Sequence, residues 1–426
     1  LMESAILLGA FLLLAALGVP LAYAMGLSTA FVMIFVLDIG LAAFFSRAFA
    51  GIDAFALLAI PFFVFVGELL TGGGMSKRLI DFANSLMGWM RGGLGNVNVG
   101  ASVLFGGVSG SSAADTAAIG GVMIPEMKRA GYDPGFAAAV TASSATIGSL
   151  IPPSVLLIIY GGIAGLSIGD LFLAGVGPGL TVGVFLFLYT WWRGRQQVGA
   201  EVAFSLANVG RTSARAGLTG ILPVLLVWGI LTGATTATEA GVVGAVYSLL
   251  LGKFIYRELT WRSILGMAAK TAELTGALML LLFTATAFAW VLAFVGLPRL
   301  IVEAIFSISE NPSVIIIIVV LFLLLFGMFV ETIAAATIVA PVLLPLGAEL
   351  GFDPLHFGMI VIFTLLVGTV TPPVGILLFI CQGIAGVSTT KAVRAIAPFI
   401  AVLLGVAMVV AFVPELSTWL PSIAER

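Results

Sequence analysis

Two polar tracts interrupt a strongly apolar chain and hold side chains that can bind ions. The first, FGGVSGSSAADTAAIGG, spans residues 105–121, and the second, FGMFVETIAAATIVAP, spans residues 326–341. Oxygen atoms are the ligands that hard cations prefer, and a carboxylate within an apolar segment is costly and usually functional. We therefore predict a substrate-binding site formed by the following residues of the two tracts: Ser109, Gly110, Ser111, Ser112, Asp115, Glu331 and Thr332.

Each tract is followed by a pair of prolines that must break a helix. The sequence has SLIPPS at 149–154 and GTVTPPV at 368–374. Proline lacks a backbone donor, and the residue before it leaves helical geometry. Backbone carbonyls near 148–151 and 368–371 should therefore lack intrahelical partners. Such carbonyls, together with neighbouring Ser and Thr hydroxyls, are suitable ligands for a hard cation such as Na⁺.

The two acidic residues have structural alternatives. Asp115 lies three residues after Ser112, so it either completes a capping box for the following helix or binds a ligand. For Glu331 we favour a functional role, because an acid at membrane depth is expensive to keep.

The elements that hold these residues must be membrane-spanning helices. Hydrophobic residues make up 61% of the 426 residues and charged residues only 9%, whereas a soluble domain has about 25% charged residues. Several apolar runs reach the roughly 20 residues that a transmembrane helix needs. A single Cys excludes an internal disulfide, and a single His argues against a His-based metal site. We expect an all-α integral membrane protein.

The chain repeats one structural plan in its two halves. The segment IGSLIPPSVLLIIYGGIAGLS at 147–167 matches VGTVTPPVGILLFICQGIAGVS at 367–388. The Lys and Arg content of three pairs of equivalent loops changes sides between the halves, which by the positive-inside rule indicates opposite orientations in the membrane. We predict two inverted-topology repeats, residues 1–215 and 216–426.

Each repeat is predicted to contain five crossings and one re-entrant hairpin. The hairpins are 94–128 and 312–348, and the Pro-Pro pairs break the helices 138–165 and 357–387. About ten crossings place both termini outside the cytoplasm. The crossings lie near 4–25, 27–45, 52–72, 138–165, 171–190, 216–232, 237–252, 271–296, 357–387 and 395–414.

The second arm of each hairpin begins a helix at membrane depth. A helix N-terminus carries about half a positive charge and free N–H groups. Two such ends facing each other would attract an anionic solute. Inverted repeats with broken helices and midplane sites are typical of secondary transporters. No GxxxxGK[ST] tract is present, so we expect an ion gradient to supply the energy.

The chain resembles the large membrane subunit of the tripartite ATP-independent periplasmic (TRAP) transporters from about residue 5 to residue 415. The motifs that carry the resemblance are SGSSAADTAAIG, PEMKRAGYDPGFAAAVTASSATIGSLIPPS, TATEAGVVGAVYSLLL, FVETIAAATIVAPVLLPL and GTVTPPVGILLF. The resemblance implies a permease of the bacterial inner membrane, not an enzyme, with both predicted termini in the periplasm. It also implies two protein partners, a small membrane subunit and a periplasmic substrate-binding protein.

The resemblance further implies Na⁺-coupled import of a carboxylated solute such as a sialic acid or a C4-dicarboxylate, with no other cofactor and no nucleic-acid partner. An elevator motion would carry a transport domain, about 94–190 and 312–414, against a scaffold, about 1–93 and 216–311. The family's Na⁺ sites correspond here to Ser109, Ser111, Gly148, Ser149, Ile151, Gly327, Thr332, Gly368, Thr369 and Thr371.

Two other functions remain open from the sequence. A stand-alone ion-coupled carrier of the dicarboxylate or citrate type would need no binding protein. A channel or a membrane scaffold belongs to a different class, but the paired breaks in the two halves argue against both.

Overall fold

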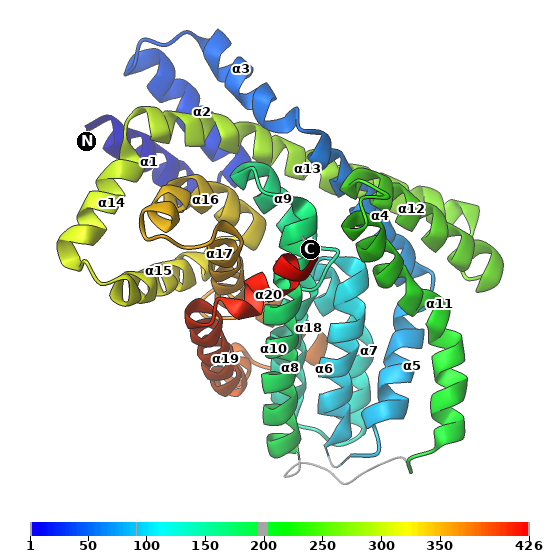
Figure 1. The fold of residues 1–426 in the computed structure, drawn as a ribbon. Coiled ribbons are helices and arrows are strands. Elements are labelled where there is room, and N and C mark those ends of the chain that lie inside the picture. The colour runs from blue at the N-terminus through cyan, green and yellow to red at the C-terminus, as the bar shows by residue number, and fades with distance from the viewer. Residues whose placement is uncertain (1, 91, 195–202, 425–426) are drawn as a thin grey trace.

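The first half of the chain folds into helices in the computed structural model shown in Figure 1. The structure describes residues 2–90, 92–194 and 203–424, and these contain no strand, which confirms the predicted all-α class for this part of the chain. The first-half helices are α1 (Met2–Ala16), α2 (Leu21–Phe35), α3 (Leu41–Ile52), η1 (Phe55–Leu58), α4 (Ala59–Gly72), α5 (Met75–Met87), α6 (Gly93–Ser109), α7 (Ser112–Arg129), α8 (Pro134–Ala145), η2 (Thr146–Ser149), α9 (Val155–Ala164) and α10 (Ile168–Gly194).

The second half begins with different helices, but its elements α14–α19 follow a similar order of lengths to α5–α10 in the first half. Its elements are α11 (Leu206–Leu231), α12 (Ala237–Leu250), the π-helix η3 (Leu251–Ile255), α13 (Trp261–Phe294), α14 (Leu297–Ile308), α15 (Pro312–Gly327), α16 (Thr332–Glu349), α17 (Pro354–Gly368), α18 (Ile376–Ala385), α19 (Thr389–Phe412) and α20 (Glu415–Ala424).

The N-terminal segment is divided more finely than the sequence predicted. The predicted crossing 4–25 is interrupted between α1 and α2, where Gly18 has a φ of 84° and Pro20 precedes α2. The predicted crossing 27–45 is interrupted between α2 and α3, where Asp38 has a φ of 54°. Both boundaries were therefore wrong, because left-handed residues and proline end helices inside apolar sequence.

Fewer helices are long enough to span a bilayer than the predicted crossings require. By length and composition, six of the described helices could cross a membrane, or seven if the α4–α5 pair, bent by 67°, counts as one span. Several predicted crossings are shorter apolar helices of 10–17 residues, such as α1, α2 and α17. The count of ten crossings and the re-entrant nature of the hairpins stay predictions.

A tight turn joins two consecutive helices at each predicted hairpin. Helices α6 and α7 meet at Gly110, which has a φ of 63°, and helices α15 and α16 meet just before Glu331. The prolines interrupt α8–η2–α9 in the first half and α17–α18 in the second, and both Pro-Pro bonds are cis. Asp133 and Asp353 cap α8 and α17 and are each followed by a proline.

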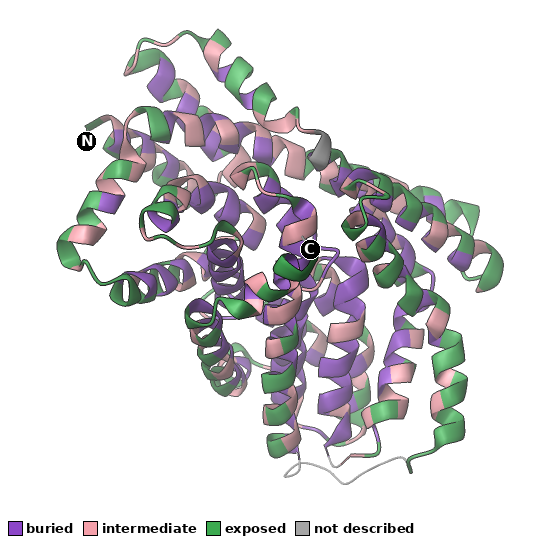
Figure 2. Cartoon of the chain, in the orientation of Figure 1, coloured by how far each residue is buried: buried purple, intermediate pink, exposed green. Residues whose placement is uncertain are grey.

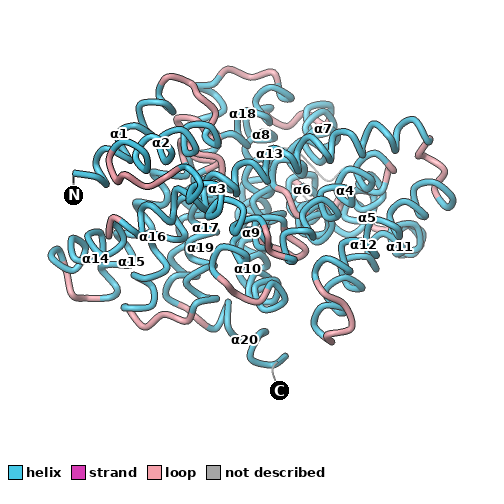
Figure 3. Tube along the Cα trace, turned by 90° about the horizontal axis from the view of Figure 1, so that it is seen from above, coloured by secondary structure: helices cyan, strands magenta, loops and turns pink. Residues whose placement is uncertain are grey.

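Helices at equivalent positions of the two halves form much of the core. Helices α8 and α17 are buried along nearly their whole length, as the buried residues in Figure 2 show. The peripheral helices expose large apolar side chains such as Phe35 and Leu265, which is the surface expected to face lipid. Seen from above in Figure 3, α14 and α15 lie at one end of the molecule and α11 and α12 at the opposite end.

Candidate functional site

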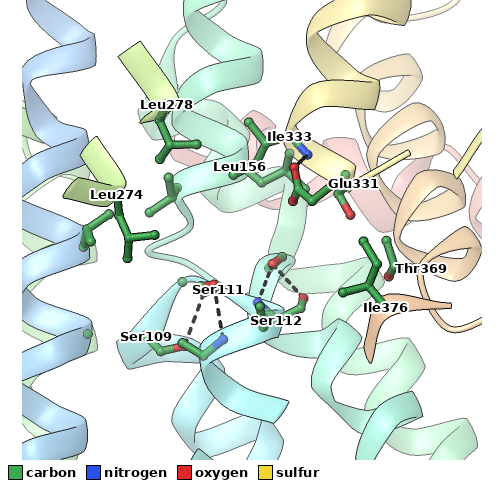
Figure 4. Close-up of a pocket in the computed structure, with 18 of the residues that line it drawn as sticks. Ser109, Ser111, Ser112, Leu156, Leu274, Leu278, Glu331, Ile333, Thr369 and Ile376 are labelled. Atoms are coloured by element: carbon green, nitrogen blue, oxygen red, sulfur yellow. Dashed lines mark hydrogen bonds between the residues drawn. The ribbon is translucent and has the colours of Figure 1, made fainter. Parts of the chain in front are cut away.

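A cavity of about 290 Å³ lies between the two hairpin turns and the helices α4 and α13. Figure 4 shows Ser109, Ser111 and Ser112 on one side of this space, with Glu331 and Thr369 across it. Segments far apart in the sequence therefore meet at one solute-sized space. The lining residues that were predicted are Ser109, Gly110, Ser111, Ser112, Ser149, Glu331, Thr332 and Thr369.

The remaining predicted residues lie outside this lining. Ile151 packs against Gly179 of α10, and Thr371 is buried with its hydroxyl donating to the Val367 carbonyl at 2.7 Å. The predicted residues that do not line the cavity are Asp115, Gly148, Ile151, Gly327, Gly368 and Thr371.

The first hairpin turn is bonded directly to the break that follows it. The Ser112 backbone N–H donates to Ser149 Oγ at 3.0 Å, and the two hydroxyl oxygens of these residues lie 2.7 Å apart. Ser154 Oγ donates to the Ser149 carbonyl at 2.7 Å. The Gly110 carbonyl accepts from the Val155 N–H at 3.2 Å. The hydroxyl and carbonyl oxygens of the turn and of the break therefore lie close together.

Asp115 is fully buried behind this turn. Its Oδ1 accepts a hydrogen bond from the Ser109 hydroxyl, and among the described residues its Oδ2 has no partner. Oδ2 lies against the backbone of Gly148, because a Cβ there would come within 1.7 Å of it. The capping-box alternative is wrong: Ser111 is the N-cap of α7, which places Ala114, not Asp115, at the third helical position.

The second hairpin turn uses an acid where the first uses a hydroxyl. Glu331 is the N-cap of α16, and its Oε2 accepts from the backbone N–H groups of Ile333 at 2.9 Å and Ala334 at 3.2 Å. In α7 the same role falls to Ser111, which accepts from Ala114 N–H at 3.4 Å. The start of α16 therefore has two N–H groups already occupied by its own carboxylate.

The carbonyls at the Pro-Pro breaks are more satisfied than the sequence predicted. The Ser149 carbonyl accepts from Ser154, as described above, and the Gly368 carbonyl accepts from Thr371 N–H at 2.9 Å. The Thr369 carbonyl accepts from Leu377 N–H across the break at 3.2 Å. A carbonyl oxygen has two lone pairs, so each can still contact a cation.

Glycines allow the hairpins to touch the broken helices at equivalent positions of the two halves. A Cβ added at Gly106 would lie 2.9 Å from Gly148 Cα, and one added at Gly368 would lie 2.6 Å from Gly327 Cα. Backbone therefore meets backbone at both places. Gly148, Gly327 and Gly368, which were predicted as Na⁺ ligands, lie in these contacts.

The opposite wall of the cavity contains a carboxylate that is paired with a lysine behind it, which the sequence did not predict. Glu68 of α4 lines the cavity, and its Oε1 lies 2.7 Å from Lys270 Nζ of α13. Aliphatic side chains complete this wall, among them Leu274 and Leu278 of α13 (Figure 4). An acid inside the apolar run IPFFVFVGELL was the signal that pointed to Glu68.

A second cavity of about 300 Å³ lies further along α13. It is bounded by α3, α9 and α16 in addition to α13, whose Leu282, Ala285 and Trp290 face it. Helix α13 therefore lines two separate spaces, one against the hairpin turns and one closer to its C-terminal end.

Two solved structures share the fold of this chain. The Alcanivorax borkumensis YdaH transporter matches with a TM-score of 0.62 and 15% sequence identity, covering 94% of this chain and 96% of that one. The Neisseria gonorrhoeae MtrF efflux pump matches with the same TM-score of 0.62 at 13% identity, covering 89% and 84% of the two chains. The chain therefore shares its fold with these two proteins.

Sequence relatives identify the family. The family model "Tripartite ATP-independent periplasmic transporter, DctM component" matches residues 8–416. The 2,3-diketo-L-gulonate TRAP transporter large permease YiaN of Escherichia coli K12 is 35% identical over 412 residues, covering 96% of this chain and 97% of that protein. The chain belongs to the DctM family of TRAP transporter large permeases and is not an enzyme.

Other relatives in the family are named for different solutes. The sialic acid large permease SiaM of Vibrio cholerae is 36% identical, covering 88% of both chains. The C4-dicarboxylate large permease DctM of Pseudomonas aeruginosa is 37% identical, also covering 88% of both. The chain is about equally identical to transporters of different solutes, so sequence identity alone does not select one of these solutes for this chain.

Proposed function

We propose that this chain is the translocating subunit of a Na⁺-coupled importer of a carboxylated solute of the sialic acid or C4-dicarboxylate class. The solute would bind in the cavity between the two hairpin turns. Cations would bind beside it, where the turn Ser109–Ser112 meets Ser149 and where Thr332 lies near Thr369. The small membrane subunit and the periplasmic binding protein that the family implies would complete the system, and both termini of the chain would face the periplasm.

The charge of the cavity is the observation that supports coupling to a cation. Two carboxylates, Glu68 and Glu331, line it, and none of the described lining residues is Lys, Arg or His. Lys270 neutralises Glu68 at the wall, so Glu331 is the acid of the described lining that has no paired cation. An anionic solute is repelled by this carboxylate unless cations enter with it. Na⁺ bound at the hydroxyl groups would provide that positive charge.

The two cavities along α13 support an elevator motion. The hairpins and broken helices contact one another through backbone at glycines, so they can move as a unit. Movement of this unit along α13 would exchange the first cavity for the second as the space beside the hairpin turns. Alternating access of this kind is the expected behaviour of an inverted-repeat transporter.

Reconstituted uptake tests the proposal. Proteoliposomes that contain the chain and its small subunit would be supplied with the binding protein and labelled sialic acid or succinate. We expect uptake of one of these only with an inward Na⁺ gradient and the binding protein. Ser111→Ala and Thr369→Ala should each raise the Na⁺ concentration for half-maximal uptake while expression stays normal.

Two outcomes would reject the assignment. Unchanged Na⁺ activation in both variants would remove the cation sites from these residues. Uptake without any soluble protein would favour the alternative of a stand-alone dicarboxylate or citrate carrier.

A further inference from the structure

A separate charged cavity lies where the start of α5, the middle of α11 and residues 255–258 meet. Its volume is about 510 Å³, and it shares no lining residue with the candidate solute cavity. The charge pattern of the sequence places these segments on the cytoplasmic side of the scaffold. Its charged lining residues are Lys77, Arg78, Asp81, Arg215 and Glu258.

Contacts with Gly74, Glu258 and Tyr256 hold Arg78 in the wall of this cavity. Its Nη1 donates to the Gly74 carbonyl at 2.8 Å, and its Nη2 lies 2.7 Å from Glu258 Oε1. Its guanidinium carbon lies 3.9 Å from the centre of the Tyr256 ring. The Glu258 carboxylate also lies against Gly74, where an added Cβ would come within 1.7 Å of Oε2. These contacts hold the wall in place, and they pair the charge of Arg78 with that of Glu258.

Lys77 and Arg215 are the cations left available to a ligand. Both are exposed at the cavity, and within the described residues neither forms an ion pair. Asp81 is the single remaining acid of the described lining, so the unpaired groups have a net positive charge. Two cations on different helices, facing one space, suit an anionic group with several acceptor oxygens.

The rim of the cavity is apolar, which favours a lipid over a soluble anion as the ligand of this cavity. Leu218 and Ile255 line it and are 38% and 55% exposed. The neighbouring Phe254 and Trp261 are also exposed, and Lys253 lies over the Trp261 ring. Trp and Lys of this kind are typical of the membrane–water boundary. The cavity thus joins a cationic interior to a surface suited to acyl chains.

We propose that this cavity binds the phosphate headgroup of an anionic phospholipid between Lys77 and Arg215, with the acyl chains against Leu218 and Ile255. Basic pockets between helices on the cytoplasmic side can bind such headgroups. The bound lipid would connect α5, α11 and the segment before α13. Helix α5 and that segment lie in the predicted scaffold, and α11 enters it at residue 216. The site is independent of the solute that the chain transports.

Lipid titration of the full chain in detergent tests this proposal. Native mass spectrometry and the thermal unfolding midpoint would be followed with phosphatidylglycerol, phosphatidylcholine and inorganic phosphate as separate probes. We expect preferential binding of phosphatidylglycerol and a higher midpoint with it. The double variant K77Q/R215Q should bind it roughly 30-fold more weakly, since each cation near an anionic lipid contributes about 1 kcal/mol.

The matched control is Arg262→Gln, which removes an exposed cation of α13 that does not line the cavity and should bind like the wild type. The single variants K77Q and R215Q, each expected to weaken binding roughly 5-fold, replace the double variant if it is poorly folded. Equal binding by the cavity variants and Arg262→Gln would overturn the proposal. Equal binding of phosphatidylcholine, or equal stabilisation by inorganic phosphate alone, would overturn it as well.

Discussion

Lys391 Nζ lies 2.5 Å from Asp133 Oδ2, which joins the first turn of α19 to the N-cap of α8. Close by, Lys128 Nζ donates to the Ala385 carbonyl at 2.7 Å. Each contact connects the first half of the chain to the second. The charge pattern predicts the cytoplasmic side for both partners of the ion pair, and an inverted pair of repeats requires such segments to meet at one face.

The Asp133–Lys391 pair predicts a dependence of stability on pH. Burial raises the pKa of the Asp133 carboxyl, but hydrogen bonds from Lys391 and from the Phe136 and Gly135 N–H groups outweigh it and hold the pKa below its ordinary value. A carboxyl with a lowered folded-state pKa stabilises the fold above the unfolded value of about 4, and this is lost as the pH falls through the folded value.

At pH 7, Asp133→Asn should lower the unfolding free energy by at most about 1 kcal/mol, because the pair is partly exposed. Asp133→Ala should cost about 1 kcal/mol more, because it also removes the N-cap. Chemical unfolding in detergent from pH 7 to pH 3 measures both. A wild-type advantage over Asp133→Asn that persists in acid would contradict the expected linkage.

The backbone contacts at Gly106 and Gly368 predict that a single added methyl group lowers the stability of the protein. Gly106→Ala and Gly368→Ala should each destabilise the protein by about 1–3 kcal/mol, because the added methyl group meets backbone that cannot move aside. Gly121→Ala in α7 is the control, because a Cβ there meets nothing within 4 Å. The thermal midpoint of each purified variant measures the effect, and similar midpoints for all three would refute the packing argument.

Substitution of Glu331 separates its capping role from its charge. Glu331→Ser restores the type of cap that Ser111 gives α7, so we expect normal thermal stability. Loss of the negative charge should raise the Na⁺ concentration for half-maximal uptake roughly tenfold, since 1.4 kcal/mol of cation attraction corresponds to that factor. Glu331→Ala should also lose about 1 kcal/mol of stability. If the Ser variant has normal Na⁺ dependence, Glu331 is a cap alone.

The Glu68–Lys270 pair predicts a rescue by double substitution. Lys270→Gln leaves an unpaired carboxylate facing the cavity, so an anionic solute should bind more weakly and its KM for uptake should rise. Glu68→Gln with Lys270→Gln removes both charges and should restore the KM towards the wild-type value. A double variant as impaired as Lys270→Gln would show that the lysine itself contacts the solute.

The sequence predicted the features that depend on local chemistry and missed those that depend on packing. The Pro-Pro breaks were placed correctly as helix boundaries, because the prolines restrict the backbone directly. The capping-box alternative for Asp115 required Ser112 to be the N-cap of α7, whereas the structure has Ser111 there, since neighbouring serines are equivalent in a pattern. Glu68 was missed as part of the cavity because periodicity does not show which helix face meets a distant hairpin.

The apolar wall of α13 has an energetic consequence for the proposed motion. Leu274 and Leu278 face the first cavity, and Leu282 and Ala285 face the second. A moving domain would exchange one set of aliphatic contacts for another of the same kind, so neither position gains much free energy over the other. Two nearly isoenergetic positions allow the few kcal/mol of bound ions and solute to decide which one is populated.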